Sequence, residues 1–423
     1  MIKSLSLIFI FSTVVALIQS CSDNDPRPKE VLLTVEIDPG YFYTGFDAWI
    51  FISDKNGNPI DVRQATDSTL IKFIGAPQST ITFSIFNRST TTNGDGSKWT
   101  SFGFDSYQEI PIGSTIQLKR GVGNHLQIPD VIGAAPFTLQ EYEDSDKPED
   151  ALVITDGIST PYSVLDYSSN VQTGTNFSSQ LYLRKNPSTI LVTTYRNDVP
   201  VYYWLNDVSP NETMLFDFDS FIPSKTISIN KQVALGTVKT MKGADFATAY
   251  IFSDLYSRQV SKSSHLAQLP ILGYLDGFEK YFVSVAQHQL NAADNLYYSK
   301  AGTIPLSINL PDYSYSIISE ELHNVSLNFS NDYSYKQANF LKANSESQVF
   351  WNLNASDKED FKAPKIPVEI QKLYPTLNTD GIKLQFAAYT HWLDGYTYLD
   401  AARAFLTTNP RDVYEELRYV VKP

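Results

Sequence analysis

Cysteine is almost absent from this chain, since Cys21 is the only one among 423 residues. A single thiol cannot form a disulfide within the chain, so no disulfide framework holds the fold together. Stability must therefore come from hydrophobic cores. About 400 residues are too many for one core, so we expect two to four domains.

Positive charge is also scarce. The chain has 33 lysine and arginine residues against 46 acidic ones, which gives a formal net charge of −13. It contains no cluster of basic residues with interleaved aromatics, whereas proteins that bind nucleic acids carry basic patches. We therefore expect no nucleic-acid partner.

Motifs of catalysis and cofactor binding are missing as well. The sequence has no Gly-x-Ser-x-Gly nucleophile elbow and no Walker-type phosphate loop. The five histidines are far apart, so they offer no zinc-ligand spacing on one helix. The acidic segments Asp54–Asp61 and Glu141–Asp150 leave calcium binding open, although the first also fits a hairpin turn and the second a solvated linker. We predict no catalytic residue, no metal site and no cofactor.

The N-terminus carries a targeting pattern. Lys3 precedes the apolar run Leu5–Ile18, and Ile18-Gln19-Ser20-Cys21 has the form apolar-x-small-Cys. The run is shorter than the roughly 20 residues of a membrane-spanning helix. A charged, proline-containing stretch follows it, which favours a cleavage boundary over a membrane span.

This pattern resembles the lipobox of bacterial lipoproteins, and the acidic stretch Ser22–Asp25 resembles the export signal of surface lipoproteins in Bacteroidota. The resemblance implies that residues 1–20 are a signal peptide and that Cys21 is acylated and becomes the mature N-terminus. It also implies a lipid anchor in the outer membrane, with the protein facing the exterior and residues 21–30 serving as a tether. An ordinary secretory signal followed by a free cysteine is the alternative.

Aromatic residues are abundant, which indicates β-sheet. The chain has 26 tyrosines and 25 phenylalanines against 3 methionines, and aromatic rings pack well on a pleated surface. Strand patterns such as Ala48–Ile52 and Thr80–Asn87, separated by turn signals such as Asn56-Gly57, have the spacing of β-sandwiches. We predict a mainly β protein of tandem antiparallel β-sandwich domains with an immunoglobulin-like arrangement.

Prolines, glycines and charge runs divide the mature chain into four predicted domains. These are β-sandwiches at 31–128, 129–230 and 231–318, and a β-rich C-terminal domain at 319–423. We interpret the third as a repeat of the first on three segments found in the same order: Ala48–Asp54 with Ala249–Asp254, Thr80–Phe86 with Lys280–Val285, and Ile110–Ile116 with Ile304–Ile308. A weaker likeness links Val201–Asn206 to Gln348–Asn354.

The end of the chain fits two structures. Asn409-Pro410 resembles a helix start, and Val413, Leu417 and Val420 would give that helix one apolar face. We favour a short C-terminal helix, with a strand at Leu417–Val421 as the alternative.

Aromatic residues gather just before this point, around a glycine turn. We take three of them, Trp392, Tyr396 and Tyr398, together with the acid Asp394 as candidate ligand-binding residues. In a hairpin, Tyr396 and Tyr398 would share one strand face about 6–7 Å apart. Successive rings could then meet successive sugar units, with Asp394 accepting hydrogen bonds from hydroxyls. Burial of these rings in a core is the alternative.

We expect non-catalytic binding at the cell surface, of a glycan or an envelope protein, through tandem β-modules. In architecture and address the chain resembles the surface lipoproteins that accompany polysaccharide-uptake systems. One alternative is a structural or accessory lipoprotein of an envelope complex. Another is a glycosidase or peptidase with an unrecognised site.

Overall fold

The computed structural model describes most of the chain from residue 29 onward. It describes residues 29–42, 47–66, 68–92, 94–119, 130–140, 153–155, 171–173, 176–196, 199–233, 235–241, 253–259, 269–288, 295–407, 411 and 413–423. The predicted signal peptide, Cys21, most of the tether and the acidic run Glu141–Asp150 lie outside these residues. Within the described ranges, no helix combines the length and the apolar character that a membrane span requires.

The prediction of a mainly β fold is confirmed, and the first module is a two-sheet sandwich. Its strands are β1 (Glu30–Ile37), β2 (Asp47–Ser53), β3 (Pro59–Gln64), β4 (Leu70–Gly75), β5 (Thr80–Thr92), β6 (Lys98–Pro111) and β7 (Ser114–Leu118). One sheet has the order β4-β1-β7, with β1 and β7 parallel, and the other runs β3-β2-β5-β6. Leu33, Ile50 and Phe83 are fully buried in the core that both sheets share.

Two further modules follow along the chain. The second contains β8 (Gly133–Gln140), β9 (Val153–Thr155), β10 (Val171–Thr173), β11 (Asn176–Leu183), β12 (Ser188–Arg196), β13 (Val199–Val208) and β14 (Met214–Asp217), and β15 (Ile222–Pro223) pairs with β13. The third contains β16 (Lys225–Val233), β17 (Leu235–Met241), β18 (Ser253–Gln259), β19 (Leu269–Tyr274), β20 (Lys280–His288), β21 (Asn295–Gly302) and β22 (Ser307–Ile308).

The same strand arrangement occurs in all three modules. In each, the first strand pairs antiparallel with the fourth and parallel with the seventh. The fifth strand lies between the second and the sixth. The third strand pairs with the second in the first and third modules, and with the fourth in the second module. The sequence pattern alone indicated this likeness only for the first and third modules.

The segments that suggested the repeat differ in how well they match the strands. Thr80–Phe86 lies in β5 and Lys280–Val285 in β20, which are equivalent fifth strands. Ala48–Asp54 covers β2, the second strand, whereas Ser253-Asp254 begins β18, the third strand. At Ser253 and Asp254, the two residues of the later segment that the structure describes, this pair therefore does not join equivalent strands. Residues 249–252 lie outside the described ranges.

The C-terminal strands connect the first module to the third. They are β23 (Tyr315–Ser319), β24 (Ser326–Phe329), β25 (Tyr335–Ala343), β26 (Ser347–Ser356), β27 (Lys383–Trp392) and β28 (Tyr414–Val421). One twelve-stranded sheet results, in the order β18-β17-β20-β21-β28-β27-β25-β26-β6-β5-β2-β3. β26 pairs parallel with β6 of the first module, and β28 pairs antiparallel with β21 of the third.

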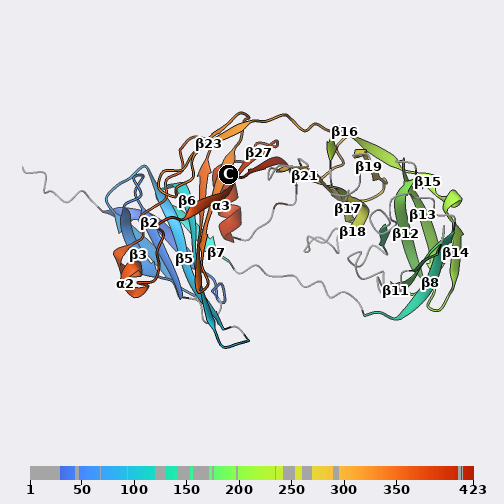
Figure 1. Ribbon diagram of the computed structural model, residues 1–423, viewed down its shortest axis with the longest axis horizontal. Coiled ribbons are helices and arrows are strands. Elements are labelled where there is room, and N and C mark those ends of the chain that lie inside the picture. The colour runs from blue at the N-terminus through green and yellow to red at the C-terminus, as the bar shows by residue number, and fades with distance from the viewer. Residues whose placement is uncertain are drawn as a thin grey trace, which may run out of the picture.

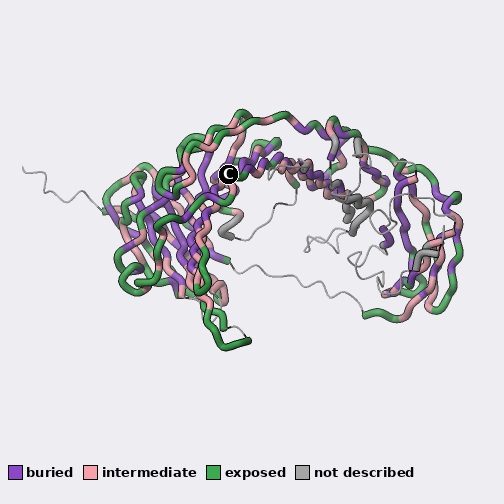
Figure 2. The backbone as a smooth tube through the Cα atoms, in the orientation of Figure 1, coloured by how far each residue is buried: buried purple, intermediate pink, exposed green. Residues whose placement is uncertain are grey.

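This sheet gives the molecule its elongated form. Figure 1 shows the first module and the C-terminal strands at one end and the second module at the other, with strands of the third module between them. Buried residues run along the strands at both ends (Figure 2). Leu191 and Tyr195 of β12 belong to the same core cluster as Val283 and Leu296 of the third module, so the second and third modules pack together.

The expected helix after Pro410 is wrong, because Tyr414–Val421 forms strand β28. Leu417, Tyr419 and Val421 are buried, which is the period-two pattern of a strand. A helix does occur earlier, at α3 (Tyr398–Thr407), and a short one at α2 (Val368–Leu373). Helix α3 packs its first turns on the core of the first module.

Candidate functional site

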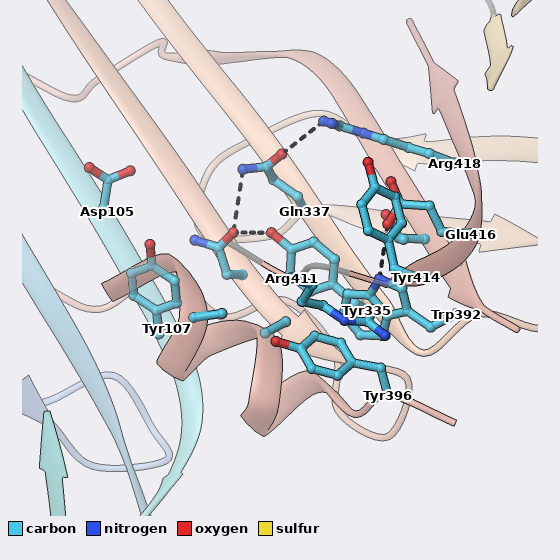
Figure 3. A pocket seen from close by; sticks show the side chains of 14 residues that line it. Asp105, Tyr107, Tyr335, Gln337, Trp392, Tyr396, Arg411, Tyr414, Glu416 and Arg418 are labelled. Carbon is cyan, nitrogen blue, oxygen red and sulfur yellow. Dashed lines mark hydrogen bonds between the residues drawn. The ribbon is translucent and has the colours of Figure 1, made fainter. Parts of the chain in front are cut away.

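A pocket of about 590 Å³ opens on one face of the twelve-stranded sheet, where the C-terminal strands meet the first module (Figure 3). Pockets of roughly 300–1,000 Å³ hold small ligands. The residues that line it come from β6, β25, β26, β27, β28, helix α3 and the loops beside it. They are Asp105, Tyr107, Tyr335, Gln337, Asn354, Thr390, Trp392, Tyr396, Ala401, Ala404, Arg411, Tyr414, Glu416 and Arg418.

Strand register brings these distant residues onto one face. Asn354 of β26 lies opposite Tyr107 of β6 on one side and Gln337 of β25 on the other. Thr390 of β27 lies opposite Tyr335 and Arg418 in the same way. Successive side chains of a strand point to opposite faces, so every second residue reaches the pocket. The residues between them supply the cores on the other face.

A hydrogen-bonded row of polar side chains forms the middle of the pocket. The Tyr335 hydroxyl donates to Asn354 Oδ1 at 2.6 Å, and Gln337 Nε2 lies 3.4 Å from the same oxygen. Asn354 Nδ2 donates to the carbonyl oxygen of Ser106 at 3.1 Å. Arg418 Nη2 lies 3.5 Å from Gln337 Oε1, which is a weak contact. The amides are thus held in place, while the exposed guanidinium of Arg418 can turn to an incoming ligand.

Aromatic rings form one end of the pocket. Tyr335 stacks on Trp392 with ring centroids 5.6 Å apart, and Tyr396 meets Trp392 edge-on at 5.2 Å. The guanidinium carbon of Arg411 lies 3.7 Å from the Tyr396 ring centroid, and this arginine also forms an ion pair with Asp394. Arg411 Nη1 is buried with no hydrogen-bond partner among the described residues. A donor therefore remains for a ligand acceptor.

The carboxyl group of Glu416 lies against this aromatic end. Trp392 Nε1 donates to Glu416 Oε2 at 3.1 Å. Burial raises the pKa of Glu416, although the Trp392 hydrogen bond and the charges of Arg418 and Arg411 act in the opposite direction. Arginine charges thus compensate the acids at this end of the pocket.

Asp105 lies at the other end (Figure 3). Its Oδ1 accepts a hydrogen bond from Asn352 Nδ2 at 2.7 Å. Asp105 forms no ion pair with any lysine or arginine that the structure describes. Burial raises the pKa of this carboxyl group, which the Asn352 hydrogen bond only partly offsets. Burial raises the pKa of the Tyr107 hydroxyl too, and the charge of Asp105 adds to that effect.

The four candidate residues predicted from the sequence occupy different positions relative to the pocket. Trp392 and Tyr396 line the pocket, and Asp394 lies at its edge through the pair with Arg411. Tyr398 is buried, with its hydroxyl 2.9 Å from the carbonyl oxygens of both Gln108 and Asn354. The predicted hairpin is wrong, because Tyr398 begins helix α3. Tyr396 and Tyr398 therefore do not share a strand face.

The remaining pocket residues were not predicted from the sequence. Asp105 with Tyr107, Tyr335 with Gln337, and Asn352 with Asn354 are polar or aromatic residues spaced by two along their strands. That spacing indicates a strand with one face that is neither fully exposed to solvent nor packed in a hydrophobic core. It cannot show that three such strands, far apart in the sequence, lie side by side. The hydrogen-bonded pair Asp105–Asn352, for example, spans 247 positions.

The first of the two acidic segments, Asp54–Asp61, begins with a hairpin turn. The Asp54–Asn58 segment is the hairpin turn between β2 and β3, and the Asp54 carboxylate accepts hydrogen bonds from the backbone N–H groups of Asn56 and Asn58, both at 2.8 Å. Among the residues that the structure describes, no cluster of three His, Cys, Asp or Glu side chains could hold a metal ion.

Asp105 and Glu416 cannot act as a pair of glycosidase carboxyl groups. Their strands, β6 and β28, are separated by four strand spacings in the order β28-β27-β25-β26-β6. At about 4.8 Å per spacing the backbones are about 19 Å apart. Glycosidase carboxyl pairs lie roughly 5–10 Å apart.

Comparison of the sequence with models of known protein families and with curated proteins gives no match. The function is therefore inferred from the pocket and from the N-terminal targeting pattern.

Proposed function

We propose that the protein is a lipid-anchored binding protein of the outer cell surface, which holds a glycan in this pocket without transforming it. The observation that carries the proposal is the composition of the pocket. Five aromatic side chains and a set of amide, carboxyl and guanidinium groups surround about 590 Å³.

A glycan matches this combination of groups. A sugar ring has an apolar C–H face and a rim of hydroxyls, so it needs a ring to lie against and planar polar groups at its edge. Tyr396 and Tyr414 are half-buried, and each therefore offers part of its ring to the pocket. Gln337, held by its neighbours, and Arg418 offer hydrogen bonds to hydroxyls. Trp392 is only 6 % exposed, so it supports Tyr396 and offers an edge at most.

The proposed anchor rests on the lipobox ending at Cys21 and on the acidic stretch after it. One acyl chain gives only weak membrane binding, while two or three hold firmly, because each buried CH₂ contributes about 0.8 kcal/mol. A pocket on an outward-facing lipoprotein would meet extracellular glycans directly.

A glycan array with the purified full chain tests the proposal. Tyr396→Ala removes a ring from the pocket. Trp204→Ala is the control, because the Trp204 side chain lies on β13 of the second module and is 40 % exposed. We expect Tyr396→Ala to weaken binding about tenfold, equivalent to about 1.4 kcal/mol, and Trp204→Ala to leave it unchanged. The absence of any bound glycan, or equal losses in the two variants, would contradict the proposal.

A further inference from the structure

We propose that the Asp105 end of the pocket is a subsite for a protonated amine, so that the bound glycan contains an amino sugar with a free amino group. This inference rests on the proposed glycan function and specifies the ligand class.

The first support is the geometry of the carboxyl group. Asn352 Nδ2 donates to Asp105 Oδ1 at 2.7 Å, and Asn339 Nδ2 donates to Asn352 Oδ1 at 2.5 Å. The second bond fixes which end of the Asn352 amide faces the acid, so the carboxyl group is held in one orientation. Its other oxygen, Oδ2, has no hydrogen bond to any described residue, and Asp105 lines the pocket.

The second support is the unequal distribution of charge. At the aromatic end, Arg411 pairs with Asp394, and the charges of Arg411 and Arg418 act on Glu416. No described cation pairs with Asp105. A ligand with a positive group is therefore attracted to the Asp105 end more than to the opposite end, where the arginines compensate the acids.

The third support is the aromatic surrounding. Tyr107 lines the pocket beside Asp105, and its ring lies 6.4 Å from that of Phe83 in the first module. Aromatic faces attract ammonium groups through their quadrupole. A carboxylate beside such a ring favours an amine over a neutral hydroxyl.

The fourth support is the destabilising effect of the Asp105 carboxylate on the folded protein. A carboxylate removed from water without a counter-cation is unfavourable. An asparagine at position 105 could accept the Asn352 hydrogen bond without the charge. A residue that breaks a folding rule with no compensating contact is expected at functional sites. A bound amine would supply the missing cation.

Two oligosaccharides of equal length test the inference, namely a β-1,4-glucosamine tetramer and its N-acetylated counterpart. Acetylation removes the positive charge and leaves the ring positions unchanged. Titration calorimetry of the full chain should show the free-amine tetramer binding at least tenfold more tightly. Asp105→Asn should abolish that preference, whereas Asp380→Asn, an exposed acid at a turn, should keep it.

The possible failures can be distinguished. Equal or tighter binding of the acetylated tetramer by the unaltered chain overturns the amine subsite. So does a preference that survives Asp105→Asn. If neither tetramer binds but the array identifies a glycan without amines that Tyr396→Ala loses, the glycan function stands and the amine subsite is wrong. A thermal melt of each variant shows that it is folded.

Discussion

Asp105 and Glu416 show how burial sets the chemistry of single residues in this pocket. Both carboxyl groups have raised pKa values because the sheet removes them from water. Glu416 has a tryptophan N–H and two arginines to stabilise its ionised form, whereas Asp105 has one amide. Asp105 is therefore the less compensated of the two, and its ionisation opposes folding.

This imbalance gives Asp105→Asn a pH-dependent effect on stability. A folded-state pKa above the unfolded value means that the folded protein binds the proton more tightly, so stability decreases as pH rises through these two values. We expect Asp105→Asn to raise the melting temperature at pH 7.5, and the gain to shrink towards pH 3.5, where the native carboxyl group is protonated too. Calorimetric melts at both pH values measure this. A lower melting temperature for the variant at pH 7.5 would contradict the account of Asp105.

Glu416 gives a second residue-scale prediction. Glu416→Gln keeps an acceptor for Trp392 Nε1 and removes a charge that Arg411 and Arg418 compensate. We expect the resulting excess of positive charge to attract anionic glycans, so that an array at low salt gains acidic sugars that the native chain does not bind. The gain should disappear in 0.5 M salt, because screening shortens the reach of the charges. An unchanged array profile at low salt would show that these arginines do not face the ligand.

At the scale of elements, the parallel pair β6–β26 holds the C-terminal strands on the first module. Trp351 of β26 is fully buried, stacks on Phe104 with centroids 4.2 Å apart, and donates from Nε1 to Ser106 Oγ at 3.0 Å. Ser106 Oγ also lies 2.9 Å from Ser84 Oγ of β5. This contact joins three strands beneath the pocket without lining it.

Removing the Trp351 ring should therefore disturb both the fold and the pocket. Trp351→Ala is expected to cost about 3–5 kcal/mol of unfolding free energy, as is usual for a large buried aromatic. The exposed Trp204→Ala is the matched control and should change stability by less than about 0.5 kcal/mol. Urea unfolding of the full chain followed by tryptophan fluorescence measures both. A loss below about 1 kcal/mol for Trp351→Ala would mean that β26 does not pack on β6 as described.

Helices and strands could be predicted from the sequence where the apolar residues followed a single spacing, either that of a helix or that of a strand. The patterns in Ala48–Ile52 and Thr80–Asn87 predicted strands, and both segments are strands in the structure. The last strand was misassigned because Val413, Leu417 and Val420 satisfy helical spacing while Leu417, Tyr419 and Val421 satisfy strand spacing. Its partners β21 and β27 decide between them, and they come from other parts of the chain.

At the scale of the whole molecule, three modules with one strand arrangement are joined by a sheet that runs through the first and third. The continuity of that sheet could not be predicted, because it depends on pairing β26 with β6, which lies nearly 250 residues earlier in the chain. The pocket follows from this pairing. Trp392 and Tyr396 were identified as candidates from local aromatic density, but Asp105 and Arg418 join them only through the sheet.

The proposed anchor also concerns the whole molecule. Cys21→Ala removes the acylation site, so the variant is expected in the soluble fraction while the unaltered chain sediments with membranes. Asp380→Asn, which leaves the whole lipobox unchanged, is the control. Immunoblots of both fractions after a high-salt wash give the result. An unacylated Cys21→Ala protein that still sediments would show that another feature holds the chain at the membrane.

The most direct test of the pocket is photoaffinity mapping of the bound glycan. The glycan selected by the array would carry a photoreactive group, and mass spectrometry would locate the cross-links on the full chain. We predict cross-links to residues around Tyr396, Arg411 and Tyr414, all of which border the pocket. Excess unlabelled glycan should suppress these cross-links. Cross-links confined to the second module, at the far end of the molecule (Figure 1), would contradict a binding site on the twelve-stranded sheet.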